Sequence, residues 1–146
     1  MRIPPAVWAA GAGLTQLAMT RGARAARATT SAATVLGVAS AGLAVGAVLR
    51  FRSRGTTVDP MDVDRAQALV TDGVNAWTRN PMYVGLAGML AAHAVHRRSP
   101  AGLLPVLGFV LAIDRWQIPA EEAALERAFG GEYDAYRRAI PRWVLR

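Results

Sequence analysis

The sequence predicts an all-α integral membrane protein with about four transmembrane helices and a cytoplasmic helical segment at its C-terminal end. Hydrophobic residues fill 53% of the 146 positions, which is more than soluble domains usually contain. They gather in four blocks that contain no charged residue, and arginines flank the blocks. Because a chain of this length accommodates one domain, we treat residues 1–146 as a single unit.

The first two blocks predict helices over about residues 3–20 and 28–49. A bilayer core of about 30 Å needs roughly 20 apolar residues, with about 17 as the lower limit. The second block exceeds this length, and its only polar side chains are Ser and Thr. A soluble helix would instead carry a charged face with a period of 3.6 residues. Pro4 and Pro5 and the weak charge before the first block favour a retained helix over a cleaved signal peptide.

The third and fourth blocks predict helices over about residues 80–97 and 99–118. Asn80 suits the N-cap of the third helix and Pro81 its first turn. The fourth helix reaches a membrane-spanning length only if it continues past Asp114 and Arg115. His93 and His96 lie one turn apart in the third block, where an interfacial pair is a simpler interpretation than a metal or proton site. The four tryptophans suit membrane interfaces.

Two polar segments, residues 50–79 and 119–146, lie on one predicted side of the membrane. More arginines lie on this side than on the other, so the positive-inside rule predicts that it faces the cytoplasm. We expect a bacterial inner membrane. In the tail, Pro119 should open a helix whose first turn holds Glu121 and Glu122. Gly130-Gly131 should end it, before a second short helix that carries Tyr133 and Tyr136.

Composition excludes several classes of function. The chain has no cysteine, so disulfides, thiolate metal sites and cysteine nucleophiles are ruled out. All 17 basic residues are arginines, and the net charge is +7. Because these arginines border apolar blocks, they suit an anionic membrane surface better than nucleic acid. We expect no metal, while the oligomeric state stays open.

Two polar motifs are candidates for chemistry. The run Arg79-Asn80-Pro81-Met82-Tyr83 begins the third helix, where a helix N-terminus and an arginine could hold an anion. The pair Glu121-Glu122 follows the fourth helix and could bind a cationic group. Each motif can also be read as an ordinary helix start. Their predicted position on one side of the membrane, at neighbouring helix ends, favours a shared site.

Residues 56–143 resemble the isoprenylcysteine carboxyl methyltransferase family and the related phospholipid methyltransferases. The resemblance rests on TTVDP, on ALVTDGVNAWTRNPMYVG and on EEAALERAFGGEYDAYRRAIPRW, in the order and spacing of that family. It implies a site for S-adenosylmethionine between the Arg-His-Pro-x-Tyr and Glu-Glu segments. The cofactor-binding residues that it implies here are Gln67, Ala68, Leu69, Val70, Arg79, Asn80, Pro81, Met82, Tyr83, Glu121 and Glu122.

The chain departs from the family at positions that bear on its substrate. Asn80 replaces the family's histidine and cannot titrate. The substrate-side arginine of the eukaryotic enzymes falls near Gln117, so we name Arg115, Gln117 and Arg142 as candidates for substrate binding. No catalytic residue is assigned.

The resemblance implies methyl transfer to a lipophilic, membrane-embedded acceptor. A carboxylate acceptor is ionised at neutral pH and needs no general base, so we favour it. The alternatives are a lipid amine, a small thiol, or a non-catalytic membrane protein that retains the fold.

Overall fold

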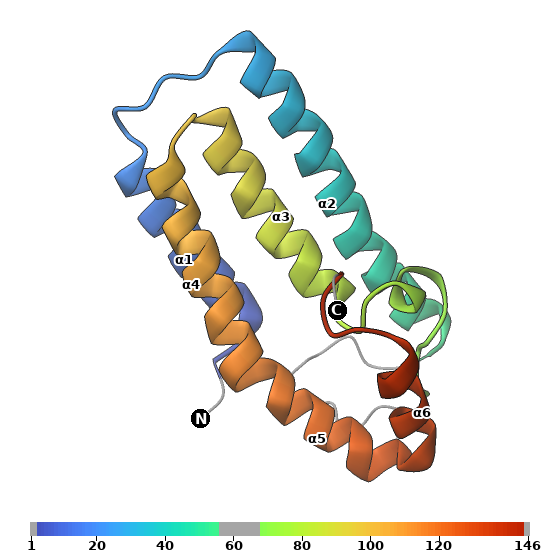
Figure 1. The fold of residues 1–146 in the computed structure, drawn as a ribbon. Helices are drawn as coiled ribbons and strands as arrows, with labels where there is room; N and C mark the ends of the chain where they lie inside the picture. Colours follow the sequence, from blue (N-terminus) through green and yellow to red (C-terminus); the bar gives the residue numbers. More distant parts are fainter. Residues whose placement is uncertain (1–2, 56–67, 145–146) are drawn as a thin grey trace.

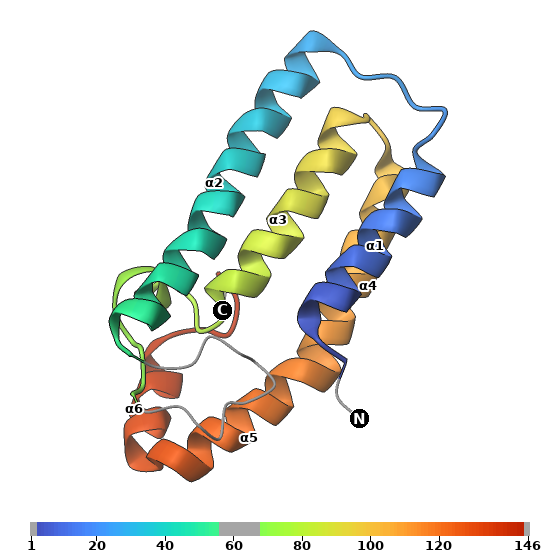
Figure 2. The same cartoon turned by 180° about the vertical axis from the view of Figure 1, so that it is seen from behind.

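The computed structural model describes residues 3–55 and 68–144, and all regular structure within these two ranges is helical. Helices α1 (Pro5–Met19), α2 (Arg27–Ser53), α3 (Pro81–His96) and α4 (Leu103–Ala112) run alongside one another (Figures 1 and 2). Helix α3 packs against α2 on one side and against α1 and α4 on the other. The all-α fold predicted from the sequence is confirmed.

The fourth helix continues further than the sequence suggested. A short turn, η3 (Pro100–Gly102), leads into α4, and a π-helical turn, η4 (Ile113–Gln117), joins α4 to α5 (Ile118–Phe129). We expected Pro119 to open a separate helix after residue 118, yet the helix passes through it. The N–H of Ile118 bonds to the carbonyl of Ile113, and this wider turn accommodates a proline that would clash in an uninterrupted α-helix.

Two helices are long and apolar enough, within the described ranges, to cross a bilayer. They are Arg27–Ser53, with 27 residues, and the continuous helix Pro100–Phe129, with 30 residues. Helices α1 and α3 contain 15 and 16 residues, slightly below the usual lower limit of about 17. The chain is therefore an all-α membrane protein, and a count of four membrane spans stays a prediction.

Small residues let α2 and α3 approach closely. A Cβ atom added at Gly85 of α3 would lie 2.6 Å from the backbone oxygen of Ser40 in α2, and one at Gly88 would overlap the Ser40 hydroxyl. Such close backbone approach is a common basis of helix association in membranes. Helix α1 is held by Gln16, which donates hydrogen bonds to Leu90 O at 2.8 Å and Gly102 O at 2.7 Å.

The two ends of the bundle differ. At the end that we call the site end, α3 begins, and α5 and α6 (Gly131–Ala139) lie beside it (Figure 1). Gly130, with φ +49°, ends α5 as the sequence predicted. At the other end, called the distal end, residues 20–26 join α1 to α2 and residues 97–102 join α3 to α4 (Figure 2).

The segment before α3 is fastened to the site end from two directions. Asp72 accepts hydrogen bonds from Arg50 of α2 and from Arg54, the residue that caps the end of α2. The bond from Arg50 is the main reason that the pKa of Asp72 is lowered to about 2. The phenol of Tyr136 in α6 donates to Asn75 O, in the turn η2 (Gly73–Ala76), at 2.7 Å. The start of α3 is therefore positioned by both α2 and α6.

Candidate functional site

The first turn of α3 begins as the sequence predicted, but it is capped differently. Pro81 occupies the first turn and Asn80 the N-cap position, yet the Asn80 side chain makes no capping hydrogen bond. Its amide instead donates to the carbonyl oxygen of Arg142 at 3.0 Å. The predicted side-chain cap is therefore wrong: the Asn80 amide is oriented by its bond to the C-terminal segment, and its oxygen accepts no hydrogen bond from the first turn of α3.

This C-terminal segment, Pro141–Trp143, is called the strap. The backbone N–H of Arg79 donates to Pro141 O at 2.9 Å, and the hydroxyl of Thr78 donates to Arg142 O at 2.8 Å. The indole N–H of Trp143 donates to Asp114 Oδ1 at 2.9 Å. The strap therefore connects the start of α3 to the π-turn at the end of α4.

The carboxylate of Glu121 joins α3 to α5. Its Oε1 atom accepts a hydrogen bond from the phenol of Tyr83 at 2.5 Å and another from the amide of Gln117 at 2.7 Å. Tyr83 is 2% exposed and belongs to the core cluster with Phe109, Ile113 and Ile118. Because Tyr83 and Gln117 are both buried, the orientation of this carboxylate is fixed from two sides.

Glu122 lies at the centre of an ion-pair chain, defined as Arg79–Glu122–Arg142–Asp114. Arg79 Nη1 lies 2.8 Å from Glu122 Oε1, and Arg142 Nη2 lies 2.6 Å from Glu122 Oε2. Arg142 Nη1 then reaches Asp114 Oδ1 at 3.1 Å. The Arg79 and Glu122 side chains are only 11% and 15% exposed, so solvent screens this pair less than it screens a surface pair.

The electrostatics of the cluster follow from these contacts. The hydrogen bond to Glu122 is the main factor that raises the pKa of Arg142, so its positive charge is secure at any physiological pH. Burial, followed by the charge of Glu122, raises the pKa of Tyr133. The neutral phenol of Tyr133 accepts a hydrogen bond from Arg79 Nη1 at 3.0 Å. Arg79 is therefore held by a carboxylate and a phenol together.

One polar atom in this cluster is left without a partner. The Nε atom of Arg79 is buried and makes no hydrogen bond to any part of the chain that the structure describes. A buried donor without an acceptor is unfavourable by about 1–3 kcal/mol. An anionic ligand that reaches this atom would therefore gain a hydrogen bond that the protein alone does not make.

The structure brings together many of the predicted site residues and separates others. Arg79, Asn80, Tyr83, Gln117, Glu121, Glu122 and Arg142 are linked by the contacts above. Pro81 is buried and Met82 half-buried in the same turn of α3, while Arg115 is exposed in the π-turn. Within the described residues, none of these hydrogen bonds involves Ala68, Leu69 or Val70. The side chain of Val70 is buried. Gln67 lies outside the described residues.

Sequence reasoning assigned no site role to Asp114 or Thr78. An ionisable residue in an otherwise apolar helix is a signal that was available for Asp114, because it stands at the end of the uncharged fourth block. Thr78 carried no comparable signal. Its role depends on the position of the strap beside the start of α3, and no local pattern in the sequence predicts that position.

Comparison with known proteins identifies the family of this chain. An uncharacterized protein of Haemophilus influenzae is 36% identical to this chain over 63 residues, which are 43% of this chain and the whole of that protein. No solved structure matches the chain. A model of the phospholipid methyltransferase family matches residues 28–132, which include Arg79, Tyr83, Glu121 and Glu122. The chain therefore belongs to the phospholipid methyltransferase family.

Proposed function

We propose that this protein transfers a methyl group from S-adenosylmethionine to a lipophilic acceptor within the membrane. The observation that carries the proposal is the direct contact between its two candidate motifs. Tyr83 contacts Glu121, although the two residues are 38 positions apart in the chain, and Arg79 contacts Glu122 across 43 positions. Membership of a methyltransferase family supports the reaction type, and the apolar helices support a membrane-embedded acceptor.

The polar groups at the site end fit the chemistry of S-adenosylmethionine. When bound, this cofactor supplies a methyl group on a positively charged sulfonium. Glu121 is suited to hold an amine or ribose hydroxyls, since a carboxylate accepts several hydrogen bonds. The partnerless Nε of Arg79 is suited to a carboxylate. Asn80 and the backbone amides after Pro81 would face the polar end of the cofactor, and Tyr83 would pack on it.

The contribution of the protein would be mainly positional. A carboxylate acceptor is already ionised at neutral pH, so the chain need not remove a proton from it. Holding two reacting groups in line can lower a barrier by about 7–11 kcal/mol. The exposed Arg115 is available to an acidic acceptor, whereas Arg142 already pairs with Glu122 and Asp114. Gln117, bonded to Glu121, would orient that carboxylate.

A lipid amine is the second candidate acceptor, because the matching family is described as a phospholipid methyltransferase family. The two acceptors give products of different chemical stability. Membranes that contain the protein would be incubated with methyl-labelled S-adenosylmethionine, and the lipids extracted. A methyl ester releases labelled methanol in alkali, whereas an N-methyl group does not. Label that survives alkali would exclude a carboxylate and favour the amine.

The central test is cofactor binding by purified protein in detergent. Calorimetry should detect binding of S-adenosylmethionine or its demethylated product. Glu121→Gln keeps the size of the side chain and removes its charge. Because a hydrogen bond to a charged group contributes about 1.5–3 kcal/mol, affinity should fall roughly ten- to a hundredfold. Glu126→Gln is the matched control, since Glu126 is 51% exposed and contacts Arg137 at 3.9 Å.

Two results of this binding test would contradict parts of the proposal. Folded wild-type protein that binds neither compound would favour a non-catalytic protein that retains the fold. Equal losses of affinity in Glu121→Gln and Glu126→Gln would keep the enzyme reading but remove the role of Glu121.

We also propose that the site end faces the cytoplasm of a bacterial inner membrane. A cysteine placed at Glu132 should then react with a membrane-impermeant reagent only after the cells are opened, whereas one at Ala25 should react in intact cells.

A further inference from the structure

The distal end of the bundle carries a concentration of positive charge, and its two connections contain no acidic residue. Five arginines lie there: Arg21, Arg24, Arg27, Arg97 and Arg98. The sequence has no Asp or Glu before Asp59 or between Asp72 and Asp114. These arginines, called the distal basic cluster, therefore have no carboxylate partner in the two connections that form this end.

Contacts between the two connections hold the cluster together. Arg97 Nη2 donates to Thr20 O at 2.8 Å and to Arg21 O at 3.3 Å. His93 Nε2 lies 3.3 Å from the hydroxyl of Thr20. The side chains of Arg21, Arg24, Arg27 and Arg98 are exposed. Like charges are thus collected on one surface by backbone and hydroxyl contacts, without the acidic groups that usually compensate them.

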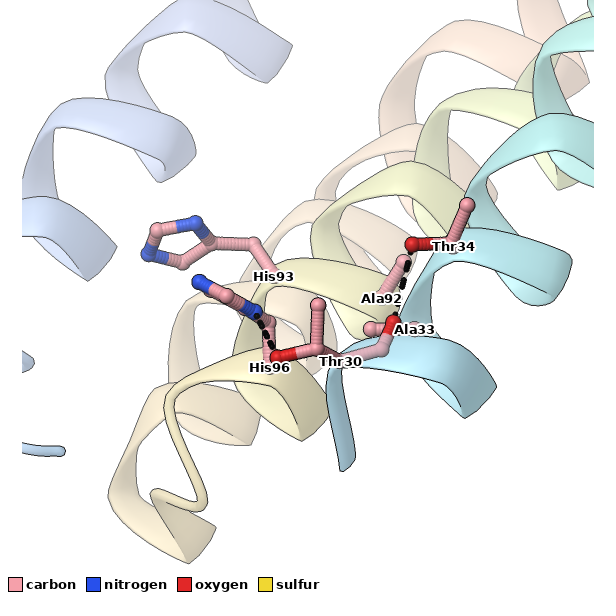
Figure 3. A pocket seen from close by; sticks show the side chains of 6 residues that line it. All are labelled: Thr30, Ala33, Thr34, Ala92, His93 and His96. Atoms are coloured by element: carbon pink, nitrogen blue, oxygen red, sulfur yellow. Dashed lines mark hydrogen bonds between the residues drawn. The ribbon is translucent and has the colours of Figure 1, made fainter. Parts of the chain in front are cut away.

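A pocket of about 300 Å³ opens beside this cluster, between the first turns of α2 and the last turns of α3 (Figure 3). Ala33 and Ala92 form buried walls, and Thr30, Thr34, His93 and His96 supply polar groups. Figure 3 shows the imidazole of His96 beside Thr30, whose hydroxyl lies 3.3 Å from His96 Nδ1. No group of three metal-ligating side chains forms anywhere in the described ranges.

Apolar surface continues from this pocket along α2. Val38 and Val45 lie about one and three turns beyond Thr34 on the same side of α2, and they are 68% and 55% exposed. In a membrane-spanning helix, side chains at this depth face the hydrocarbon chains of lipids. The surface thus changes from guanidinium groups, through a small pocket with hydroxyls and imidazoles, to exposed aliphatic side chains. A phospholipid has the same order of chemistry: phosphate, glycerol, acyl chain.

We propose that the distal end binds one anionic phospholipid, at a site separate from the methyl-transfer site. The distal basic cluster receives the phosphate, the pocket lined by Thr30 and His96 receives the glycerol region, and the acyl chains lie along α2. Arginine suits phosphate because its guanidinium donates two parallel hydrogen bonds. A bound lipid would supply the negative charge that the chain lacks here, and it would connect the start of α2 to the end of α3.

Native mass spectrometry of detergent-purified protein tests this site. Short-chain phosphatidylglycerol is compared with phosphatidylcholine of the same chain length, and a dissociation constant is measured for the first bound lipid. The wild-type protein should bind the anionic lipid more tightly. Each arginine at a membrane surface contributes about fivefold in affinity for anionic lipid, so Arg24→Gln with Arg27→Gln should weaken binding about thirtyfold.

The matched control removes the same charge from the site end. Arg52→Gln with Arg138→Gln changes two exposed arginines and should leave the dissociation constant nearly unchanged. An equal loss in both pairs would overturn the proposal in favour of general surface charge. Equal binding of the two lipids by the wild type would also overturn it. Displacement of the lipid by millimolar inorganic phosphate would indicate a free-anion site instead. If the double variant does not fold, Arg98→Gln makes the same comparison with an expected fivefold loss.

Discussion

The phenol oxygen of Tyr83 lies 2.5 Å from Oε1 of Glu121, and this bond joins the first turn of α3 to the first turn of α5. Gln117, at the end of the π-turn, donates to the same carboxylate oxygen at 2.7 Å. The carboxylate is thus held by groups from two directions before any ligand is considered. A preoriented carboxylate binds a cationic or hydroxylated ligand with less loss of side-chain freedom.

The first prediction concerns this bond. Tyr83→Phe keeps the buried ring and removes its hydroxyl, so Glu121 loses one donor. A hydrogen bond to a charged group contributes about 1.5–3 kcal/mol, and the free energy of unfolding in detergent should fall by that amount. Trp77, whose ring is 72% exposed, provides a control, since Trp77→Phe should change little. Unchanged stability in Tyr83→Phe would show that this bond contributes nothing to folding.

The second prediction concerns the ion-pair chain. Arg142→Gln leaves Asp114 and Glu122 without their shared cation, and breaking a partly buried pair in this way should destabilise the protein by about 3 kcal/mol. Asp114→Asn keeps an acceptor for the Trp143 indole while it removes one of the two negative charges that Arg142 pairs with. The double variant should therefore lose less stability than the two single losses added together. Strict additivity in thermal unfolding would contradict a direct Arg142–Asp114 interaction.

The third prediction concerns the packing of α2 on α3. In Gly85→Ala the new methyl group would lie 2.6 Å from Ser40 O, so the helices must separate. Overpacking of this kind typically destabilises by about 1–3 kcal/mol. Gly42→Ala is the matched control, because its Cβ meets nothing within 4 Å, and it should be neutral or stabilising by up to about 1 kcal/mol. Equal unfolding temperatures for the two variants would contradict the close contact.

The fourth prediction concerns alkaline pH. Burial, as the main cause, raises the pKa of Tyr136 to about 12, from the ordinary value near 10. A raised pKa favours the neutral phenol in the folded state, so its contribution to stability is complete below pH 10 and is lost as the pH rises through about 12. Ultraviolet titration of the wild type against Tyr136→Phe isolates this group. A difference spectrum with a midpoint near pH 10 would contradict the burial of this phenol.

Much of this fold could be predicted from charge-free blocks alone. The positions of α1, α2 and α3 follow from the apolar runs and from Pro5 and Pro81 at their starts. The end of α5 at Gly130 follows from the freedom of glycine at positive φ. The passage of the helix through Pro119 was not predicted, because a π-turn relieves the usual conflict between proline and helix and leaves no simple pattern in the sequence.

The site was predictable to a similar extent. Arg79, Tyr83, Glu121 and Glu122 were named from the sequence, and the structure places them in direct contact. The role of Asn80 could not be foreseen, since it depends on where the strap returns. The same holds for the pairing of Arg142 with Asp114, which are 28 residues apart. Contacts of this kind are set by tertiary packing, and local propensity carries no information about them.

The strap also has a consequence for the order in which the molecule is made. Pro141 and Arg142 follow α1 to α6 in the sequence, so the ribosome synthesises these helices before the strap exists. Until then Asp114, in the π-turn after α4, has neither Arg142 nor the Trp143 indole as a partner. The counterion of this carboxylate is thus synthesised 28 residues after the carboxylate itself. The polar centre of the nascent protein is therefore complete only after the strap has been made.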